Sequence, residues 1–326
     1  MPGLIPESAI LDDDEPVLPL EAPVPLPGRG RRHLRRLRAN PVTLAGVLLL
    51  AVFVVAGVVG PILEPHPAET IYPTAILQPP GSAFPFGTDD LGRDLLSRIL
   101  SGMRVSLAVG LGSIGAALLM GAWLGLLGGY FGGVVDALMM RVMDVLVAFP
   151  ALLLAIALMT MLGGSLASVA LAIAIIYVPI FARIMRSSVL AVSTEQYVEA
   201  VRAVGAGHRR TILRHVLPNS VSATIVQTSL AISDAILIEA ALSYLGLGVT
   251  PPTPSLGALL TEGQGFMTTQ PWMVIFPGLA LTLGVLGFNL VGDSLRDLLD
   301  PRNRAQSRGL DDERCAADGA AGGARP

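Results

Sequence analysis

Long uncharged stretches constrain the fold of this chain more than any other feature of its sequence. Residues 39–63, 105–135, 145–182 and 263–292 contain no Asp, Glu, Lys or Arg. About 20 apolar helical residues cross a hydrocarbon core of about 30 Å, so each stretch is long enough to span a membrane. Only 14% of the residues are charged, against about 25% in soluble domains. We therefore expect an all-α integral membrane protein.

Six transmembrane helices are expected from these stretches and from a fifth span that carries two acidic residues. Gly163, Gly164 and Ser165 divide the stretch 145–182, which is too long for one crossing. The first span follows a long tail and lacks a clear cleavage site, so we interpret it as retained rather than as a signal peptide. The expected spans are 39–64, 105–135, 138–162, 166–186, 221–247 and 271–294. The glycines interpreted as helix-packing sites in the second span are Gly110, Gly112, Gly115, Gly121 and Gly125.

The segments outside the spans are polar. Residues 1–38 form an acidic and then basic tail that we expect to be disordered, and residues 297–326 form a second tail. Residues 65–104 form a loop, and residues 105–296 form a core of five spans that includes the polar segment 187–219. No internal repeat is visible, which weakens the case for an inverted-repeat transporter.

The arginines indicate the orientation of the spans. With an even number of spans both termini lie on one side, and basic residues concentrate in cytoplasmic segments. Cytoplasmic termini place 19 of the 22 arginines inside or at the inner interface and leave only Arg93, Arg98 and Arg104 outside. We therefore expect an N-in, C-in protein of the inner or plasma membrane, with segment 187–219 in the cytoplasm. Membrane orientation explains the basic clusters, so nucleic-acid binding is not expected.

All 22 basic residues are arginine. A P-loop needs a lysine to reach the terminal phosphates of a nucleotide, and a PLP enzyme needs one for its Schiff base. Any ATP-driven step therefore requires another chain. The single cysteine, Cys315, excludes an intrachain disulfide and a Cys-based zinc site, and the four histidines form no HExxH pair. We expect no cofactor, no metal and no catalytic site.

The segment 187–219 carries the most specific pattern. Ser193 and Gln196 fit a capping box at the start of a helix, and Gly205 fits its end, because glycine readily adopts the left-handed conformation. The apolar face of this helix comprises Tyr197, Ala200, Val201 and Val204. A second short helix at about 208–216 has an apolar face that comprises Ile212, Leu213 and Val216. Pro218 suits the first turn of the following span.

These features predict a helix–turn–helix elbow between two membrane helices, apolar on one side and charged on the other. Such an elbow can fit a groove on a soluble partner, and rigid joints to the spans would let a push on it tilt them. An amphipathic loop lying on the lipid surface would show the same periodicity. Amphipathicity alone leaves both interpretations open.

The same segment resembles the EAA motif of ABC importer permeases, which reads Glu-Ala-Ala, three residues, Gly, nine residues and Ile-x-Leu-Pro. The matching residues are Glu199, Ala200, Gly205, Leu217 and Pro218. Val201 replaces the second alanine and adds bulk there, and His215 replaces the isoleucine. The ending His-Val-Leu-Pro-Asn is itself similar to the peptide-importer branch.

Further stretches resemble dipeptide/oligopeptide/nickel-type permeases, and the resemblance covers about 31–301. The signature Gly-Thr-Asp-x-x-Gly-Arg-Asp points to the second of the two permease types in such systems. The matching stretches are 86–94 with Ser97 and Arg98, 128–133 followed by Asp136, Arg141, Asp144 and Phe149-Pro150, 239–248, and 293–301.

The resemblance implies a type I ABC importer permease fold with a cytoplasmic coupling helix between the fourth and fifth spans. It implies a second homologous permease, two ATP-binding subunits or domains, and an extracytoplasmic solute-binding protein that delivers the substrate. Similar permeases handle dipeptides, longer peptides, glutathione-like peptides and nickel chelates, so the sequence leaves the cargo open. Transport would occur by alternating access. The residues implied to couple the chain to the ATPase are Tyr197, Glu199, Ala200, Val201, Gly205, Ala206, Arg209, Leu217 and Pro218.

Five charged residues in or near the spans are candidate pathway or gating residues, because intramembrane ionisable groups usually face protein or water. Arg141 and Asp144 can meet on one helix face as a structural ion pair, or they can act in gating with Asp136. Asp234 and Glu239 have no local basic partner. They can line the pathway, contact the partner permease, or make an interhelical hydrogen bond.

Three functions compete. The elbow and the matching stretches favour a permease subunit of an ATP-driven peptide importer. A self-contained secondary transporter would use Asp234 or Glu239 as its ion or proton site and would need no other chain. An intramembrane enzyme would need a catalytic constellation at membrane depth, and it is disfavoured because all four histidines lie outside the expected spans.

Overall fold

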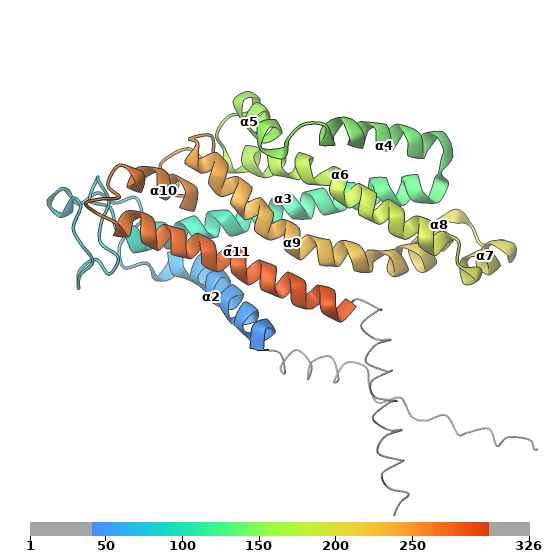
Figure 1. The fold of residues 1–326 in the computed structure, drawn as a ribbon, viewed down its shortest axis with the longest axis horizontal. Helices are drawn as coiled ribbons and strands as arrows, with labels where there is room; N and C mark the ends of the chain where they lie inside the picture. Colours follow the sequence, from blue (N-terminus) through green and yellow to red (C-terminus); the bar gives the residue numbers. More distant parts are fainter. Residues whose placement is uncertain (1–40, 300–326) are drawn as a thin grey trace, which may run out of the picture.

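The computed structural model describes residues 41–299, and all regular elements in that range are helical. The expected tails at 1–38 and 297–326 lie almost wholly outside it. The elements are α2 (Pro41–Leu63), η2 (Pro73–Ala75), α3 (Leu95–Phe131), α4 (Gly133–Val147), α5 (Ala151–Leu162), α6 (Leu166–Ser193), α7 (Gln196–Ala203), α8 (His208–Thr211), η3 (Ile212–Val216), α9 (Leu217–Tyr244), α10 (Leu256–Gln264) and α11 (Trp272–Leu299). The long helices form an elongated bundle (Figure 1).

The number of membrane crossings depends on how α4 and α5 are counted. Five helices in the described range are long and apolar enough to cross a membrane, and α4 with α5 makes a sixth if the pair is one broken span. The expectation of one helix at 138–162 is wrong, because α4 and α5 meet at an angle of 89°. Proline disfavours the α conformation in the residue before it, so the helix breaks ahead of Pro150.

The second span begins earlier than its apolar stretch. Helix α3 starts at Leu95, where the Asp94 carboxylate accepts hydrogen bonds from the backbone N–H of Ser97 at 3.3 Å and from its hydroxyl at 2.6 Å. Arg98 and Arg104, which were expected in a loop, therefore lie on the first turns of a membrane helix. Hydropathy marks only the part of a helix that can lie in lipid, whereas the N-cap residue marks where it starts.

Glycines let α3 pack very closely against α6. Gly121, Gly125 and Gly129 are spaced four residues apart and share one face of α3. A Cβ at Gly121 would lie 2.6 Å from the carbonyl oxygen of Val178, and one at Gly125 would lie even closer to that of Ala182. In membranes such small residues allow helix backbones to approach each other. The packing interpretation is confirmed for Gly121 and Gly125 of the predicted set, and Gly129 was not predicted.

The remaining predicted packing glycines differ from one another. A Cβ at Gly110 would lie 3.1 Å from the Ile236 side chain of α9, an approach that also indicates packing. Gly112 and Gly115 have no heavy atom within 4 Å of the position of a Cβ. These two glycines therefore provide no close helix contact within the described chain.

The two ends of the bundle are built differently. Figure 1 places α7 and α8 at one end and α10, with the segment linking α2 to α3, at the other. Helix α2 lies beside α11, and α9 packs against α3, α6 and α11. In the orientation that the arginines indicate, the α7 end is cytoplasmic and the α10 end is extracytoplasmic.

We predict that Gly121→Ala destabilises the protein by about 1–3 kcal/mol, because the added methyl group would overpack the contact between α3 and α6. Gly112→Ala makes the same chemical change in open space on the same helix. It should be neutral or stabilising by up to about 1 kcal/mol. Thermal unfolding of the two variants in lipid nanodiscs measures the difference, and equal stabilities would contradict the packing role of Gly121.

Candidate functional site

The elbow at the cytoplasmic end is built around the short helix α7. Its N-cap residue is Glu195, whose side chain makes no capping hydrogen bond. The predicted capping box is therefore wrong, because Ser193 is the last residue of α6. Gly205 ends the helix as predicted, with a φ of +83°. The Gly205 N–H donates to the Arg202 carbonyl at 2.9 Å, and the Ala206 N–H donates to the Val201 carbonyl at 3.2 Å, which is the Schellman pattern.

One side chain of α7 anchors the elbow to the membrane helices. Val198 is fully buried in a cluster that joins α3, α6, α7 and η3. The other buried members of this cluster are Leu126, Met185, Val189, Ile212 and Val216. A fully buried Val contributes about 1.5–3 kcal/mol. Because Val198 lies outside the apolar face seen in the sequence, its anchoring role was not predicted.

A second contact ties the elbow to the end of α3. The Tyr130 hydroxyl lies 3.0 Å from Nδ1 of His208, and the Arg202 guanidinium lies 5.1 Å from the centre of the Tyr130 ring. Tyr130 therefore contacts both helices of the elbow through a hydrogen bond and a cation–π interaction. Both contacts oppose movement of the elbow relative to α3.

The second helix of the elbow runs directly into the next span. The predicted helix at 208–216 is present as α8 and the π-helical turn η3, and α9 follows without a break. Pro218 lies in the first turn of α9, as predicted. Since Pro218 has no N–H to donate to the carbonyl four residues earlier, the wider turn ahead of it accommodates the missing bond. The second helix of the elbow and α9 therefore form one continuous rod over His208–Tyr244.

The predicted apolar face of α7 points away from the protein. Tyr197 is 43% exposed and Val204 is 89% exposed, and Ala200 is exposed beside them. Among the other residues implied to couple the chain to an ATPase, Glu199, Gly205, Arg209 and Pro218 are exposed and Val201, Ala206 and Leu217 are half-buried. The predicted apolar face of the helix at 208–216 is only partly buried, because Ile212 and Val216 are buried while Leu213 is exposed. The elbow thus has one anchored face and one available apolar face.

Charged residues of α4 pair with α6 instead of with each other. Asp144 accepts a hydrogen bond from Nη2 of Arg183 at 2.8 Å, so its partner is not Arg141 as expected from spacing. Asp136 forms a two-point ion pair with Arg186. Helical spacing revealed only the local partner, whereas the fold of α4 onto α6 brings in two arginines about 40 to 50 residues away in sequence.

The two acidic residues of α9 have different surroundings. Glu239 is fully buried and accepts hydrogen bonds from the hydroxyls of Ser106 on α3 and Ser243 on α9, each at 2.9 Å. This is the interhelical hydrogen bond that the sequence left as one alternative. Asp234 is exposed and interacts with the Tyr177 phenol of α6.

The sequence matches two known families. Residues 117–305 match the family described as binding-protein-dependent transport system inner membrane component, and residues 28–80 match the N-terminal transmembrane domain of oligopeptide transport permease C. The first match covers more than half of the chain and includes the whole elbow.

The chain belongs to this family of ABC importer permeases. It is accordingly a multi-pass protein of the inner membrane. The family membership favours the importer over a self-contained secondary transporter.

Relatives and a solved structure agree with this assignment. The permease is 42% identical to the dipeptide transport system permease protein DppC of Alkalihalophilus pseudofirmus, over 84% of this chain and 90% of the relative. It is also 42% identical to the glutathione transport system permease protein GsiD of Pectobacterium atrosepticum, over 83% and 91%. A chain from a crystal structure of the MetNI methionine ABC transporter has a TM-score of 0.51 and 17% identity, covering 62% of this chain and 96% of that chain. This likeness shows the fold.

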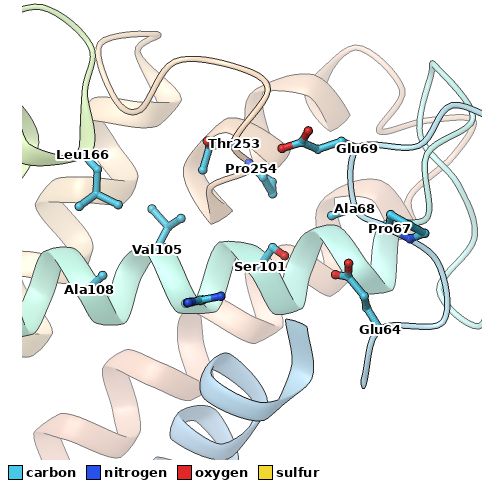
Figure 2. A pocket seen from close by; sticks show the side chains of 11 residues that line it. Glu64, Pro67, Ala68, Glu69, Ser101, Val105, Ala108, Leu166, Thr253 and Pro254 are labelled. Carbon is cyan, nitrogen blue, oxygen red and sulfur yellow. The ribbon is translucent and has the colours of Figure 1, made fainter. Parts of the chain in front are cut away.

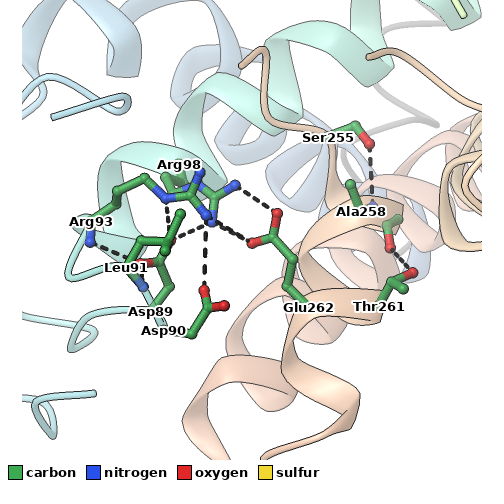
Figure 3. Close-up of polar contacts among 10 residues, drawn as sticks. Asp89, Asp90, Leu91, Arg93, Arg98, Ser255, Ala258, Thr261 and Glu262 are labelled. Atoms are coloured by element: carbon green, nitrogen blue, oxygen red, sulfur yellow. Dashed lines mark hydrogen bonds and ion pairs between the residues drawn. The ribbon is translucent and has the colours of Figure 1, made fainter. Parts of the chain in front are cut away.

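At the α10 end of the permease, buried charges tie the loop before α3 to α10. Arg98 is almost fully buried, and its Nη1 donates to Asp89 and to Glu262 at 2.5 Å each, while Nη2 donates to Glu262 at 3.0 Å. Arg93 donates from Nε to Asp89 at 2.6 Å. Figure 3 shows the two arginines between the loop and Glu262 of α10. We call this set, with Asp90, the charge clamp.

The charge clamp gives a structural role to the segment 86–94, whose sequence had indicated only a family resemblance. Gly87 and Gly92 have φ values of +79° and +81°, which only glycine adopts readily. A Cβ at Gly92 would collide with the Tyr72 carbonyl oxygen. Thr88 is fully buried and donates to the Ala75 carbonyl. Four charged residues within six positions, at 89–94, were the signal for a buried ionic structure.

The carboxylates of the clamp lie close together, and Asp89 and Glu262 are already bound by the arginines. Asp89, Asp90 and Glu262 offer oxygens within 4.8 Å of one another. Asp89 accepts from the backbone N–H groups of Leu91 and Arg93 as well as from both guanidinium groups. The arginines thus supply the positive charge that a metal cation would otherwise supply, and the cluster holds the loop before α3 against α10.

We predict opposite effects for two neighbouring substitutions in the clamp. Asp89→Asn would leave the buried Arg98 undercompensated and should destabilise the permease by about 3–5 kcal/mol. Burial and the carboxylates of Asp89 and Glu262 raise the pKa of Asp90 above its ordinary value, so its ionised form is unfavourable in the folded state. Asp90→Asn should therefore preserve or raise thermal stability at neutral pH.

Thermal unfolding over a range of pH measures both effects. A raised folded-state pKa contributes stability that is present at low pH and is lost as the pH rises through that pKa. Any advantage of Asp90→Asn should therefore disappear as the pH falls toward the ordinary pKa of an aspartate. Equal loss of stability in the two variants at neutral pH would disprove this account of the clamp.

Proposed function

We propose that this permease forms the translocation pathway of an ATP-driven peptide importer together with a second homologous permease. Two ATP-binding subunits or domains dock on its cytoplasmic side, and a solute-binding protein delivers peptides from outside. ATP hydrolysis belongs to those partner subunits in this proposal, because a chain without lysine cannot form a P-loop. Relatives named for dipeptide, glutathione and di/tripeptide transport support a peptide cargo.

The observation that carries this proposal is the two-sided elbow. Val198 and Tyr130 hold α7 to α3, α6 and η3, while Tyr197, Ala200 and Val204 remain exposed. Helix α7 lies at one end of the bundle (Figure 1). A helix with one apolar face open suits a groove on a soluble partner. Its opposite attachment to several spans suits the transmission of force.

The route of force follows the packed contacts. A displacement of α7 moves the Val198 cluster, and this cluster includes Leu126 of α3, Met185 of α6 and Val216 at the base of α9. Packed interiors resist compression and transmit strain. Closure of the ATPase pair would then tilt these three spans together and change which side of the membrane the pathway faces. The energy for this change comes from ATP bound to the partner subunits.

The five residues proposed for pathway or gating roles fall into two groups, three whose carboxylates bind arginine or serine side chains and two others that are exposed. Asp136 and Asp144 bind arginines of α6, so we propose that they hold α4 against α6 near the cytoplasmic end. Glu239 is occupied by two hydroxyl donors, which suits a structural role. Asp234 and Arg141 are exposed and remain the proposed pathway or partner-facing positions.

We predict that Val204→Asp weakens docking of the ATPase subunits without unfolding the permease. Val204 is 89% exposed, so a carboxylate there costs little folding stability, but it would be buried without a partner in an apolar groove. The measurement is the amount of ATPase that co-purifies with the permease, together with peptide uptake in proteoliposomes. We expect a loss of at least about tenfold in uptake, corresponding to about 1.4 kcal/mol.

Val204→Thr is the matched control, because it keeps the shape of the side chain and adds no charge. It should retain most of the uptake and the full complement of ATPase. If Val204→Asp also retained both, then the exposed face of α7 would not be the docking surface. Reduced uptake with a full complement of bound ATPase would instead support the lipid-surface interpretation.

A pair of glycines tests whether the shape of the elbow matters. Gly205 has a φ of +83°, whereas Gly207 has an ordinary φ of −65°, and both have open space around the position of a Cβ. We predict that Gly205→Val sharply reduces uptake per ATP hydrolysed, because a β-branched residue disfavours φ > 0. Gly207→Val should reduce it far less. Equal coupling ratios in the two variants would exclude a requirement for the left-handed turn.

A further inference from the structure

A cavity of about 470 Å³ lies at the extracytoplasmic end, outside the elbow and the charge clamp. Its walls come from the segment after α2, the outer part of α3, the start of α6 and the loop before α10 (Figure 2). This volume lies within the range of about 300–1,000 Å³ that is usual for small-molecule sites. Four separate segments of the chain therefore converge on a space large enough for a short peptide.

One wall of the cavity carries an arginine whose charge is not neutralised. Of the three extracytoplasmic arginines, Arg93 and Arg98 bind acidic residues of the charge clamp. Arg104 lines the cavity, is exposed, and has no carboxylate within ion-pair distance among residues 41–299. An unpaired charge on a membrane helix faces water or a ligand rather than lipid.

Another segment lining the cavity carries two carboxylates, and neither forms an ion pair with any residue in the range 41–299. Glu64 and Glu69 line the cavity from the segment after α2, and the Glu69 carboxylate points toward Thr253 and Pro254 across the space (Figure 2). One oxygen of Glu64 is buried and has no hydrogen-bond partner in the described chain. The positive and negative groups are thus held on separate walls instead of forming an ion pair with each other.

Apolar surface separates these charges. Val105 and Ala108 lie one and four residues after Arg104 on α3, and Leu166 and Pro254 contribute further apolar surface. A ligand that satisfies the cavity must therefore carry an anionic end, a cationic end and an apolar or mixed body between them. A short peptide with free termini has this pattern, with a carboxylate for Arg104 and an ammonium group for the glutamates.

We propose that this cavity is an entry subsite in which Arg104 binds the terminal carboxylate of an incoming peptide and Glu64 with Glu69 binds its ammonium group. The subsite receives the peptide at the extracytoplasmic mouth, before the spans tilt. This inference rests on the proposed function, because it needs a peptide cargo. It adds a recognition step by the permease to the selection made by the binding protein.

The first experiment measures uptake of labelled alanyl-alanine by the complete transporter in proteoliposomes at saturating binding protein. Arg104→Gln should lower the uptake rate at least about tenfold, since a charge-assisted hydrogen bond is lost. Arg104→Lys keeps the charge and should retain most of the rate. Arg296→Gln, which removes an exposed arginine at the cytoplasmic end, should have no effect. Unchanged uptake in Arg104→Gln would overturn the subsite.

The second experiment probes the cavity without relying on the binding protein. Ser101 lines the cavity, so Ser101→Cys in a Cys315→Ser background places a single thiol there. A membrane-impermeant maleimide should label it in the purified complex in nanodiscs. Alanyl-alanine should slow the labelling more than its C-terminal amide does, and Arg104→Gln should abolish that difference. The ammonium side is tested in the same way. Alanyl-alanine should slow the labelling more than its N-acetylated form does, and Glu69→Gln should abolish that difference.

The outcomes separate the subsite from the proposed function. If the wild-type transporter fails to import any peptide, the proposed function fails. If it imports alanyl-alanine while the acid and the amide protect the thiol equally, only the subsite is disproved. Absence of labelling would show that lipid or the partner permease covers the cavity, and would also disprove it. Protection by anionic lipid but not by dipeptide would assign Arg104 to lipid phosphate instead.

Discussion

The close contact of α3 with α6 is the interaction on which the rest of the structure depends. It is possible only because Gly121, Gly125 and Gly129 let the two backbones meet. Helix α3 is 37 residues long and reaches from one end of the bundle to the other (Figure 1). A long helix held rigidly against a neighbour can connect its two ends, and α3 contacts the charge clamp at one end and the elbow at the other.

At the outer end, α3 carries Arg98 of the charge clamp and Arg104 of the cavity. At the inner end, it carries Leu126 and Tyr130, which contact the elbow. Because few charges are available in this apolar chain, their placement is informative. The buried Asp89 and Arg98 are paired across elements, whereas Arg104 is exposed where a ligand can reach it.

Sequence patterns predicted the parts of this structure that depend on local geometry. The spans, the helix stop at Gly205 and the proline at the start of α9 are governed by hydropathy and backbone preference within a few residues. The break ahead of Pro150 was missed, although its dipeptide was visible, because hydropathy contains no backbone information. The capping box at Ser193 was wrong, because tertiary packing extended α6 through a position that also suited a helix start.

The sequence by itself determined that this protein is a helical membrane protein and that it has no P-loop of its own, and it predicted the orientation, because these inferences follow from the kinds of residue present and their spacing. Only the tertiary structure decided the partners of the charges. Asp144 binds Arg183 rather than Arg141, Arg98 binds Glu262 164 residues away, and Arg104 binds none of the described carboxylates. Such pairings depend on distances between helices, which no periodicity along the chain records.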